Sequence, residues 1–177
     1  ARYDQYDLNI DLPQPLVRRR WRVTVPERLD NTGNVLVPLD EAASTPTGVN
    51  ELDRVLGSGI VAGAVILVAG EPGVGKSTLL LQAAAAVAAS GRTALYASSE
   101  ESRVQVRARA ERLGALTDRL WPHAEASVDD LVGALDSVRP DLVVVDSVQT
   151  AFDPETTSSP GSLNQVRAVA QRLVVEA

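Results

Sequence analysis

The stretch that decides the fold runs from residue 64 to residue 77 and reads AVILVAGEPGVGKS. Its first six residues form an uninterrupted apolar run, which is typical of a strand buried on both faces of a parallel sheet. The other eight match the pattern G-x-x-x-x-G-K-[ST] at every fixed position. Residues 76–89, rich in Leu and Ala and followed closely by Gly91, predict a helix. A strand, a glycine-rich turn and a helix in this order predict a phosphate-binding loop.

The chemistry of this loop follows from its residue types. Glycines let backbone N–H groups turn inward around phosphate oxygens, and the helix N-terminus adds positive potential. Lys76, the only lysine of the chain, is predicted to reach the β- and γ-phosphates, and the Ser77 hydroxyl to bind magnesium. The alternative is a glycine turn without a ligand, whereas the spacing around Gly73 does not fit a dinucleotide-binding turn. The predicted nucleotide-binding residues are Gly70, Glu71, Pro72, Gly73, Val74, Gly75, Lys76, Ser77 and Thr78.

Strand and helix patterns alternate along the rest of the chain. Strands are predicted near residues 93–97, around Leu120 and at 142–146, and helices near 103–113, 128–138 and 163–175. Such alternation implies right-handed crossovers, so the predicted class is α/β, with a mainly parallel sheet between layers of helices. Residues 153–161, which begin with Asp153 and end with Gly161, are rich in Pro, Ser and Thr and predict a mobile loop.

Carboxylates follow two of the predicted strands. Asp146 ends the apolar run at 142–146, where an acid can serve phosphate-bound magnesium, although many buried strands end in Asp as a cap. Glu100 and Glu101 follow the strand at 93–97. Glu100 is the candidate that orients and deprotonates water, and Glu101 is a candidate second acid. The alternative for this pair is a favourable interaction with the dipole of the following helix.

Composition restricts the remaining possibilities. The chain has no cysteine and a single histidine, which argues against disulfides and zinc and leaves oxygen ligands for any metal. The net charge of −6 argues against coating DNA by bulk electrostatics. No apolar run approaches the roughly 20 residues of a membrane span, so a soluble, cytoplasmic protein is expected, with no membrane partner.

The first 36 residues contain several prolines and have weak periodicity, and we expect an extended N-terminal arm with short strands. The arm includes the basic cluster Arg18-Arg19-Arg20-Trp21-Arg22, which is either a nucleic-acid contact or, more often, a solvated strand. The predicted organisation is an arm at residues 1–36 and a nucleotide-binding core at residues 37–177.

Five motifs together resemble one family over roughly residues 37–177. They are TGVNELDRVLG at 47–57, the phosphate loop followed by TLLLQ at 78–82, SEES at 99–102, RLG at 112–114 and DSVQT at 146–150. This combination resembles bacterial RadA, also called Sms, whose ATPase core is RecA-like. The resemblance implies a DNA-dependent ATPase of recombinational repair that forms rings, expected to be hexamers, and remodels single-stranded or branched DNA. A recombinase is a candidate protein partner.

Carried over by position, the resemblance implies that Lys76 and Glu100 act in catalysis, with ATP as substrate and Mg²⁺ as cofactor. Ser77 would bind the metal directly and Asp146 through water. RecA-type ATPases place DNA-facing loops after the strand that ends in the metal-site acid, here the predicted strand at 142–146. The loop at 153–161 and Arg167 are therefore candidate DNA contacts.

The chain departs from the family in three respects. It lacks the four-cysteine zinc finger, the Lys-Asn-Arg-Phe-Gly motif with the C-terminal domain, and the later strands of the ATPase sheet, so the core is expected to be incomplete at its C-terminal end. Two alternatives stay open. One is a replicative-helicase-like or KaiC-like ATPase of the same fold, and the other is a nucleotide-dependent DNA-binding scaffold with little hydrolysis.

Overall fold

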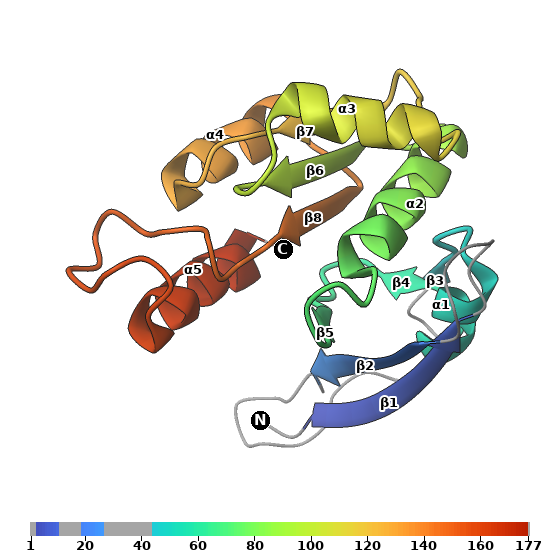
Figure 1. The fold of residues 1–177 in the computed structure, drawn as a ribbon, viewed down its shortest axis with the longest axis horizontal. Helices are drawn as coiled ribbons and strands as arrows, with labels where there is room; N and C mark the ends of the chain where they lie inside the picture. Colours follow the sequence, from blue (N-terminus) through green and yellow to red (C-terminus); the bar gives the residue numbers. More distant parts are fainter. Residues whose placement is uncertain (1–2, 11–18, 27–43, 177) are drawn as a thin grey trace. The chain divides into compact units, whose positions relative to one another are not determined.

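The computed structural model describes residues 3–10, 19–26 and 44–176, of which the first two ranges are described by their backbone alone. The chain divides into two compact units, Ala1–Leu79 together with Ala177, and Leu80–Glu176. Figure 1 shows the helices and strands, coloured from blue at the N-terminus to red at the C-terminus. The predicted domain boundary after residue 36 lies outside the described residues and stays a prediction.

Among its described residues, the first unit contains two small antiparallel sheets and a short helix. Strands β1 (Tyr3–Ile10) and β2 (Arg19–Pro26) pair with each other, and β5 (Leu67–Ala69) adds to β2. Strand β3 (Ser44–Thr45) pairs with β4 (Ile60–Val61), and helix α1 (Asn50–Val55) lies between them in the sequence. The expected short strands of the arm are thus present as β1 and β2, while the side chains of the Arg18 to Arg22 cluster lie outside the described residues.

The prediction for residues 64–69 was wrong in two respects. The strand is limited to residues 67–69, and it pairs antiparallel with β2, not within a parallel sheet. Leu67 is 54% exposed, so the strand is not buried on both faces. An apolar, β-branched run favours extended backbone, but it does not specify the strand with which that backbone pairs, because β-propensity mainly reflects a side chain's fit to a half-buried surface.

A close backbone contact fixes the β3–β4 pair. Gly59, directly before β4, has φ +140°, and a Cβ atom placed there would lie 2.3 Å from the carbonyl oxygen of Thr45. Only a residue without a side chain fits this position. The contact therefore fixes how the chain re-enters the sheet after α1.

The second unit is the predicted α/β layer structure. Strands β6 (Ala94–Ser98), β7 (Leu120–His123) and β8 (Leu142–Asp146) form a parallel sheet in the order β7-β6-β8. Helices α3 (Arg103–Arg112), α4 (Val128–Val138) and α5 (Leu163–Glu176) alternate with them, and α2 (Lys76–Ala89) leads into the unit. These elements match the predicted strands and helices closely, which confirms the α/β class.

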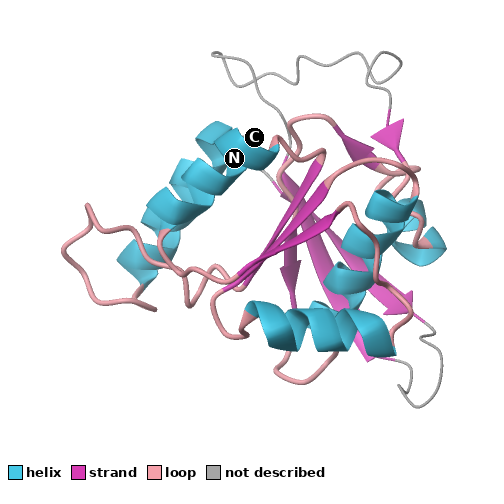
Figure 2. Ribbon diagram, turned by 90° about the horizontal axis from the view of Figure 1, so that it is seen from above, coloured by secondary structure: helices cyan, strands magenta, loops and turns pink. Residues whose placement is uncertain are grey.

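Side chains of β6 alternate between two apolar layers. Tyr96 packs with Leu81 and Val87 of α2 and Val106 of α3 on one face. Leu95 packs with Leu131 of α4 on the other, where Leu173 of α5 also lies. The strands therefore lie between helices on both sides (Figure 2). Within the described ranges, none of the helices has the length and apolar character needed to cross a membrane.

Candidate nucleotide-binding and catalytic residues

The glycine-rich loop occupies the predicted position between β5 and α2. Gly73 and Gly75 have φ +73° and +99°, a backbone region that residues with a side chain rarely adopt. Val74 between them is 7% exposed, and its backbone N–H donates to the carbonyl of Glu71 at 3.3 Å. The buried Val74 side chain holds the tip of the loop in place. The left-handed backbone of Gly73 and Gly75 on either side sets the curvature of the loop.

Lys76 begins α2 and turns back over this loop. Its Nζ donates to the carbonyl oxygens of Gly70 at 2.9 Å and Glu71 at 3.0 Å. The ammonium group therefore lies against the backbone of the loop's first two residues. The first turn of α2 contains no acidic residue, so neither Asp nor Glu there offsets the positive potential of its N-terminus. Loop, lysine and helix start together offer an anion site of the kind that binds phosphates.

The motif at residues 47–57 forms a turn held by one carboxylate. Asp53 Oδ1 accepts from the backbone N–H of Thr47 at 2.7 Å, and Oδ2 accepts from that of Gly48 at 3.1 Å. Thr47 is fully buried. Its hydroxyl accepts from the N–H of Val49 at 3.2 Å. Asp53 thus stabilises the approach to α1 within the first unit.

In the second unit, Glu100 lies at the carboxyl end of the parallel sheet. Its Oε1 accepts from the Ser147 hydroxyl at 3.1 Å and, more weakly, from the Thr150 hydroxyl at 3.5 Å. Ser147 directly follows β8, and Thr150 also contacts Ser99 through their hydroxyls. Glu100 is exposed, so its carboxylate is oriented by protein hydroxyls on one side and open to solvent on another.

The neighbouring acid, Glu101, points elsewhere. Its carboxylate forms a 2.7 Å ion pair with Arg109 of α3, and both side chains are partly buried. The capping box of Ser102 and Gln105 sets the start of α3 directly after it. The two adjacent acids are therefore separated in role by geometry: Glu100 reaches the residues that follow β8, and Glu101 reaches back to α3.

Asp146, the last residue of β8, accepts a 2.6 Å hydrogen bond on Oδ2 from the hydroxyl of Tyr96. Tyr96 is fully buried. Burial, and next the Asp146 carboxylate, raise the pKa of Tyr96 well above its ordinary value, so the phenol stays protonated and acts as the donor. Its oxygen in turn accepts from Arg109 at 2.9 Å. Sequence patterns missed Tyr96 and Arg109, because each belongs to an apolar or helical pattern and meets Asp146 only in the fold.

The loop at residues 153–161 is tied to α5 by Gln165. The Gln165 side-chain oxygen accepts from the Asp153 N–H, and its nitrogen donates to the carbonyls of Asp153, Thr156 and Ser158. Asp153 is 4% exposed and Gln165 2%. The loop thus begins in an ordered, buried turn, whereas Ser159 to Gly161 are exposed, as is Arg167 on α5. The predicted mobility and DNA contact stay predictions.

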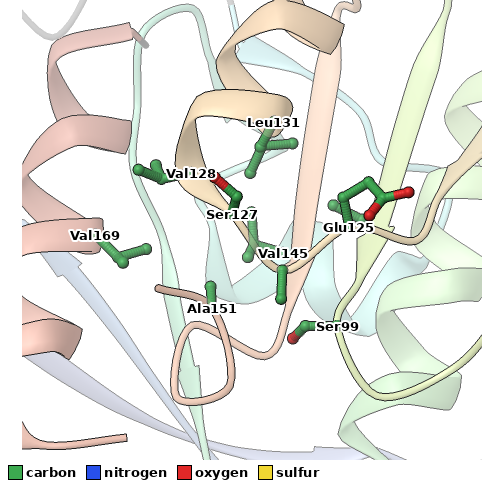
Figure 3. Close-up of a pocket in the computed structure, with 10 residues that line it drawn as sticks. Ser99, Glu125, Ser127, Val128, Leu131, Val145, Ala151 and Val169 are labelled. Atoms are coloured by element: carbon green, nitrogen blue, oxygen red, sulfur yellow. The ribbon is translucent and has the colours of Figure 1, made fainter. Parts of the chain in front are cut away.

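A small cavity lies beside the sheet end and is not a nucleotide pocket. It measures about 10 Å³, which is at the lower limit for one water molecule. Val128, Leu131, Val145 and Val169 point into it, with Ser99 and Ser127 at its margin (Figure 3). This apolar packing supports the backbone around Ser99, next to Glu100.

The donors predicted for magnesium have suitable chemistry. Asp146 offers a carboxylate and Ser77 a hydroxyl, and Mg²⁺ prefers such hard oxygen ligands, with one or two carboxylates beside water and phosphate oxygens. Asp146 Oδ1 accepts no hydrogen bond from the residues that the structure describes, whereas Oδ2 is taken by Tyr96. Within the described ranges, no group of three or more His, Cys, Asp or Glu side chains could hold a metal.

A family model described as "ATPase: KaiC" matches residues 45–134, just over half of the chain. The chain belongs to this KaiC family of ATPases. The matched range includes the glycine-rich loop, Glu100 and Glu101. Membership of the KaiC family confirms the predicted RecA-like α/β class, and it supports ATP hydrolysis as the general activity.

Several relatives carry the name DNA repair protein RadA, which confirms the predicted resemblance. The protein of Mycolicibacterium smegmatis is 54% identical over 132 residues, which is 75% of this chain and 28% of the relative. That of Mycobacterium tuberculosis is 51% identical over 134 residues, with the same shares. That of Brucella abortus is 43% identical over 141 residues, 77% of this chain and 30% of the relative. The chain thus spans less than a third of the length of these relatives.

Proposed function

We propose that this chain binds Mg²⁺-ATP at residues 70–78 and hydrolyses it in the service of DNA repair. The observation that carries the proposal is the glycine-rich loop, in which Gly73 and Gly75 adopt left-handed backbone and Lys76 turns back over the loop. Backbone N–H groups and one compact ammonium charge would bind the phosphates. Arginine would fill this role less well, because its planar guanidinium group is larger than the compact ammonium group of lysine and fits a tight loop poorly.

In this proposal the other site residues have distinct roles. Ser77 holds Mg²⁺ directly and Asp146 holds it through water, and the bound metal would neutralise charge that develops on the transferred phosphoryl group. Glu100 orients the attacking water and accepts its proton, with its carboxylate oriented by the Ser147 hydroxyl. Glu101, paired with Arg109, does not contact the hydroxyls that orient Glu100 and is not proposed to activate water.

The proposal extends to DNA because the relatives at 43–54% identity are named as DNA repair proteins. We propose a homo-oligomeric ring, expected to be a hexamer, that acts on single-stranded or branched DNA, with a recombinase as a candidate partner and the cytoplasm as its location. The loop at 153–161 carries Asp153 and Glu155, which repel phosphate. Positive charge for DNA contact would come from Arg167 and from neighbouring subunits.

Phosphate release with and without single-stranded DNA tests this function. Strong stimulation by DNA supports a DNA-dependent ATPase. Hydrolysis that DNA leaves unchanged would favour a KaiC-like ATPase without a DNA role. Nucleotide-dependent DNA binding without phosphate release would favour the scaffold alternative. A chain that binds no nucleotide would contradict all three.

The DNA-facing loop has its own test. Replacing residues 156–160 with a short glycine-serine linker is expected to weaken single-stranded DNA binding and to leave nucleotide binding intact. Arg167→Ala serves as the point variant, because it removes one exposed charge without altering the loop. Unchanged DNA affinity of a ring-forming protein, or loss of folding on replacement, would show that the loop does not contact DNA.

A further inference from the structure

The second unit contains a series of polar contacts that is not explained by nucleotide binding or by the activation of water. It links Asp146 at the end of β8, Tyr96 in β6, Arg109 in α3 and Glu101 before that helix. We propose that Tyr96 is a positioning residue for Asp146. The Tyr96 hydroxyl fixes one oxygen of the Asp146 carboxylate, so that the other oxygen faces the water molecules bound to magnesium. This inference rests on the proposed function, because it deepens the role given there to Asp146.

The register of the sheet explains why residue 96 can reach Asp146. Strands β6 and β8 are parallel neighbours in which Tyr96 pairs with Val144 and Ser98 with Asp146. Side chains two residues apart on a strand share a face, so Tyr96 and Asp146 are diagonal neighbours on one face of the sheet. Such neighbours are about 7–8 Å apart at their backbones, which an aromatic side chain spans but a Ser or Val does not. A tyrosine at this position therefore places its hydroxyl at the end of β8.

Packing holds the phenol in place. The ring belongs to the apolar cluster formed by α2, α3 and the sheet, and Tyr96 has no exposed surface. Its hydroxyl reaches out of that cluster to Asp146 Oδ2 at 2.6 Å, a short distance typical of a donor to an ionised acceptor. Because the ring is enclosed by these side chains, the carboxylate oxygen that accepts from its hydroxyl has a defined position.

Arg109 determines the direction of that hydrogen bond. Its guanidinium lies 5.6 Å from the centre of the Tyr96 ring, and its NH2 group donates to the Tyr96 oxygen at 2.9 Å. A guanidinium has no acceptor, so the phenol proton cannot point towards it and is directed to Asp146. Glu101 holds Arg109 through the 2.7 Å ion pair. Glu101 is thereby linked to Asp146 through two residues, Arg109 and Tyr96. This link accounts for an acid beside Glu100 that does not share the partners of Glu100.

The consequence concerns the two oxygens of Asp146. Oδ2 is occupied by the phenol, and Oδ1 accepts no hydrogen bond from the residues the structure describes. Groups that orient a metal-binding carboxylate in this way typically contribute 10- to 100-fold to metal affinity. Removing the phenol hydroxyl should therefore weaken Mg²⁺ binding while the phosphate loop, which lies in the other unit, retains its own affinity for nucleotide.

Tyr96→Phe tests the inference, because it keeps the ring and removes only the hydroxyl. We would measure the affinity of the chain for a fluorescent non-hydrolysable ATP analogue, first in EDTA and then across a Mg²⁺ titration. The expected result is an affinity in EDTA within about twofold of wild type, and a roughly tenfold higher Mg²⁺ concentration for half-maximal enhancement. No turnover is needed for this measurement.

Val87→Ala is the matched control, since Val87 lies in the same apolar cluster but makes no polar contact with this network. It should lower the melting temperature and leave the Mg²⁺ dependence unchanged. If Tyr96→Phe does not fold, Arg109→Met replaces it, with an expected shift of about threefold because the hydroxyl stays but loses its direction.

Three outcomes would overturn the inference in distinguishable ways. A folded Tyr96→Phe protein with the Mg²⁺ dependence of wild type would show that Tyr96 only packs the core. An equal shift in Val87→Ala would show that loss of packing alone is responsible. Wild-type protein whose nucleotide affinity does not respond to Mg²⁺ would remove the metal role of Asp146, and with it both this inference and that part of the proposed function.

Discussion

The glycine-rich loop of the first unit and the sheet end of the second unit are built by different means. The loop depends on backbone conformation: two glycines in left-handed regions, carbonyls that hold Lys76, and a helix N-terminus, all within residues 70–77. The sheet end depends on side chains from distant segments, since Ser147 contacts Glu100 and Tyr96 contacts Asp146. The loop should therefore be sensitive to substitution of its glycines. The sheet end should instead be sensitive to changes in strand register and to loss of side-chain hydroxyl groups.

Lys76→Ala gives the largest expected effect, because the loop has no other positively charged side chain. Loss of this charge should weaken nucleotide binding by roughly 3–5 kcal/mol, which is about 150- to 4,000-fold. Calorimetric titration with ATP measures it. Glu71→Ala is the control within the same loop, because Glu71 contacts Lys76 only through its backbone carbonyl. Unchanged affinity in Lys76→Ala would contradict the site assignment.

A pair of glycine variants tests the contrast in backbone. Gly59→Ala should lower the free energy of unfolding by about 3 kcal/mol, because φ +140° is strained for alanine and its Cβ would lie 2.3 Å from the Thr45 oxygen. Gly133→Ala in α4 should raise it by about 1 kcal/mol, since nothing lies within 4 Å and alanine favours helix. Urea denaturation compares the two. Equal effects of the two substitutions would contradict a special backbone at Gly59.

Glu100→Gln tests the sheet end as a catalytic region. In a form of the protein that turns over ATP, the variant should bind nucleotide normally and hydrolyse it about 100-fold more slowly, as expected when a positioned base is lost. Glu101→Gln is the matched variant and should retain most activity, because its partner is Arg109. Steady-state phosphate release and nucleotide affinity separate the two effects. Wild-type turnover in Glu100→Gln beside an inactive Glu101→Gln would reverse the roles.

His123, at the carboxyl end of β7, gives the smallest expected effect. Burial, and next the charge of Arg103, lower its pKa, although Glu125 and Asp130 oppose the shift. Because the unfolded chain binds the proton more readily, the free energy of unfolding should decrease as pH falls below about 6.5. Urea denaturation of wild type and His123→Gln at pH 8 and pH 5.5 measures it. Identical pH dependence in both proteins would show that His123 does not contribute.

The sequence predicted well what is local and less well what depends on pairing. Helix α2 and strand β8 have the predicted bounds, because periodicity and glycine caps are local signals. At residues 64–69 the sequence correctly predicted extended backbone for residues 67–69, but it did not predict the partner strand. The expected parallel neighbour was wrong, because β5 pairs antiparallel with β2. Glu100 and Asp146 were selected as candidates from their place at the ends of strands, and their roles stay predictions. Tyr96 and Arg109 were not selected, because only the register of β6 and β8 and the packing of α3 bring them to Asp146.

The amide of Gln165 has a consequence for how the chain can vary in length. The buried Gln165 side chain makes four hydrogen bonds with the backbone between Asp153 and Ser158. These bonds fix the number of residues between Asp153 and Ser158. A residue inserted or deleted there would leave a buried carbonyl or N–H without its partner, which is costly. Beyond Ser158 the exposed residues 159–161 are free of that restriction. Related proteins should therefore vary in loop length only after position 158, and a protease should cut this loop there first.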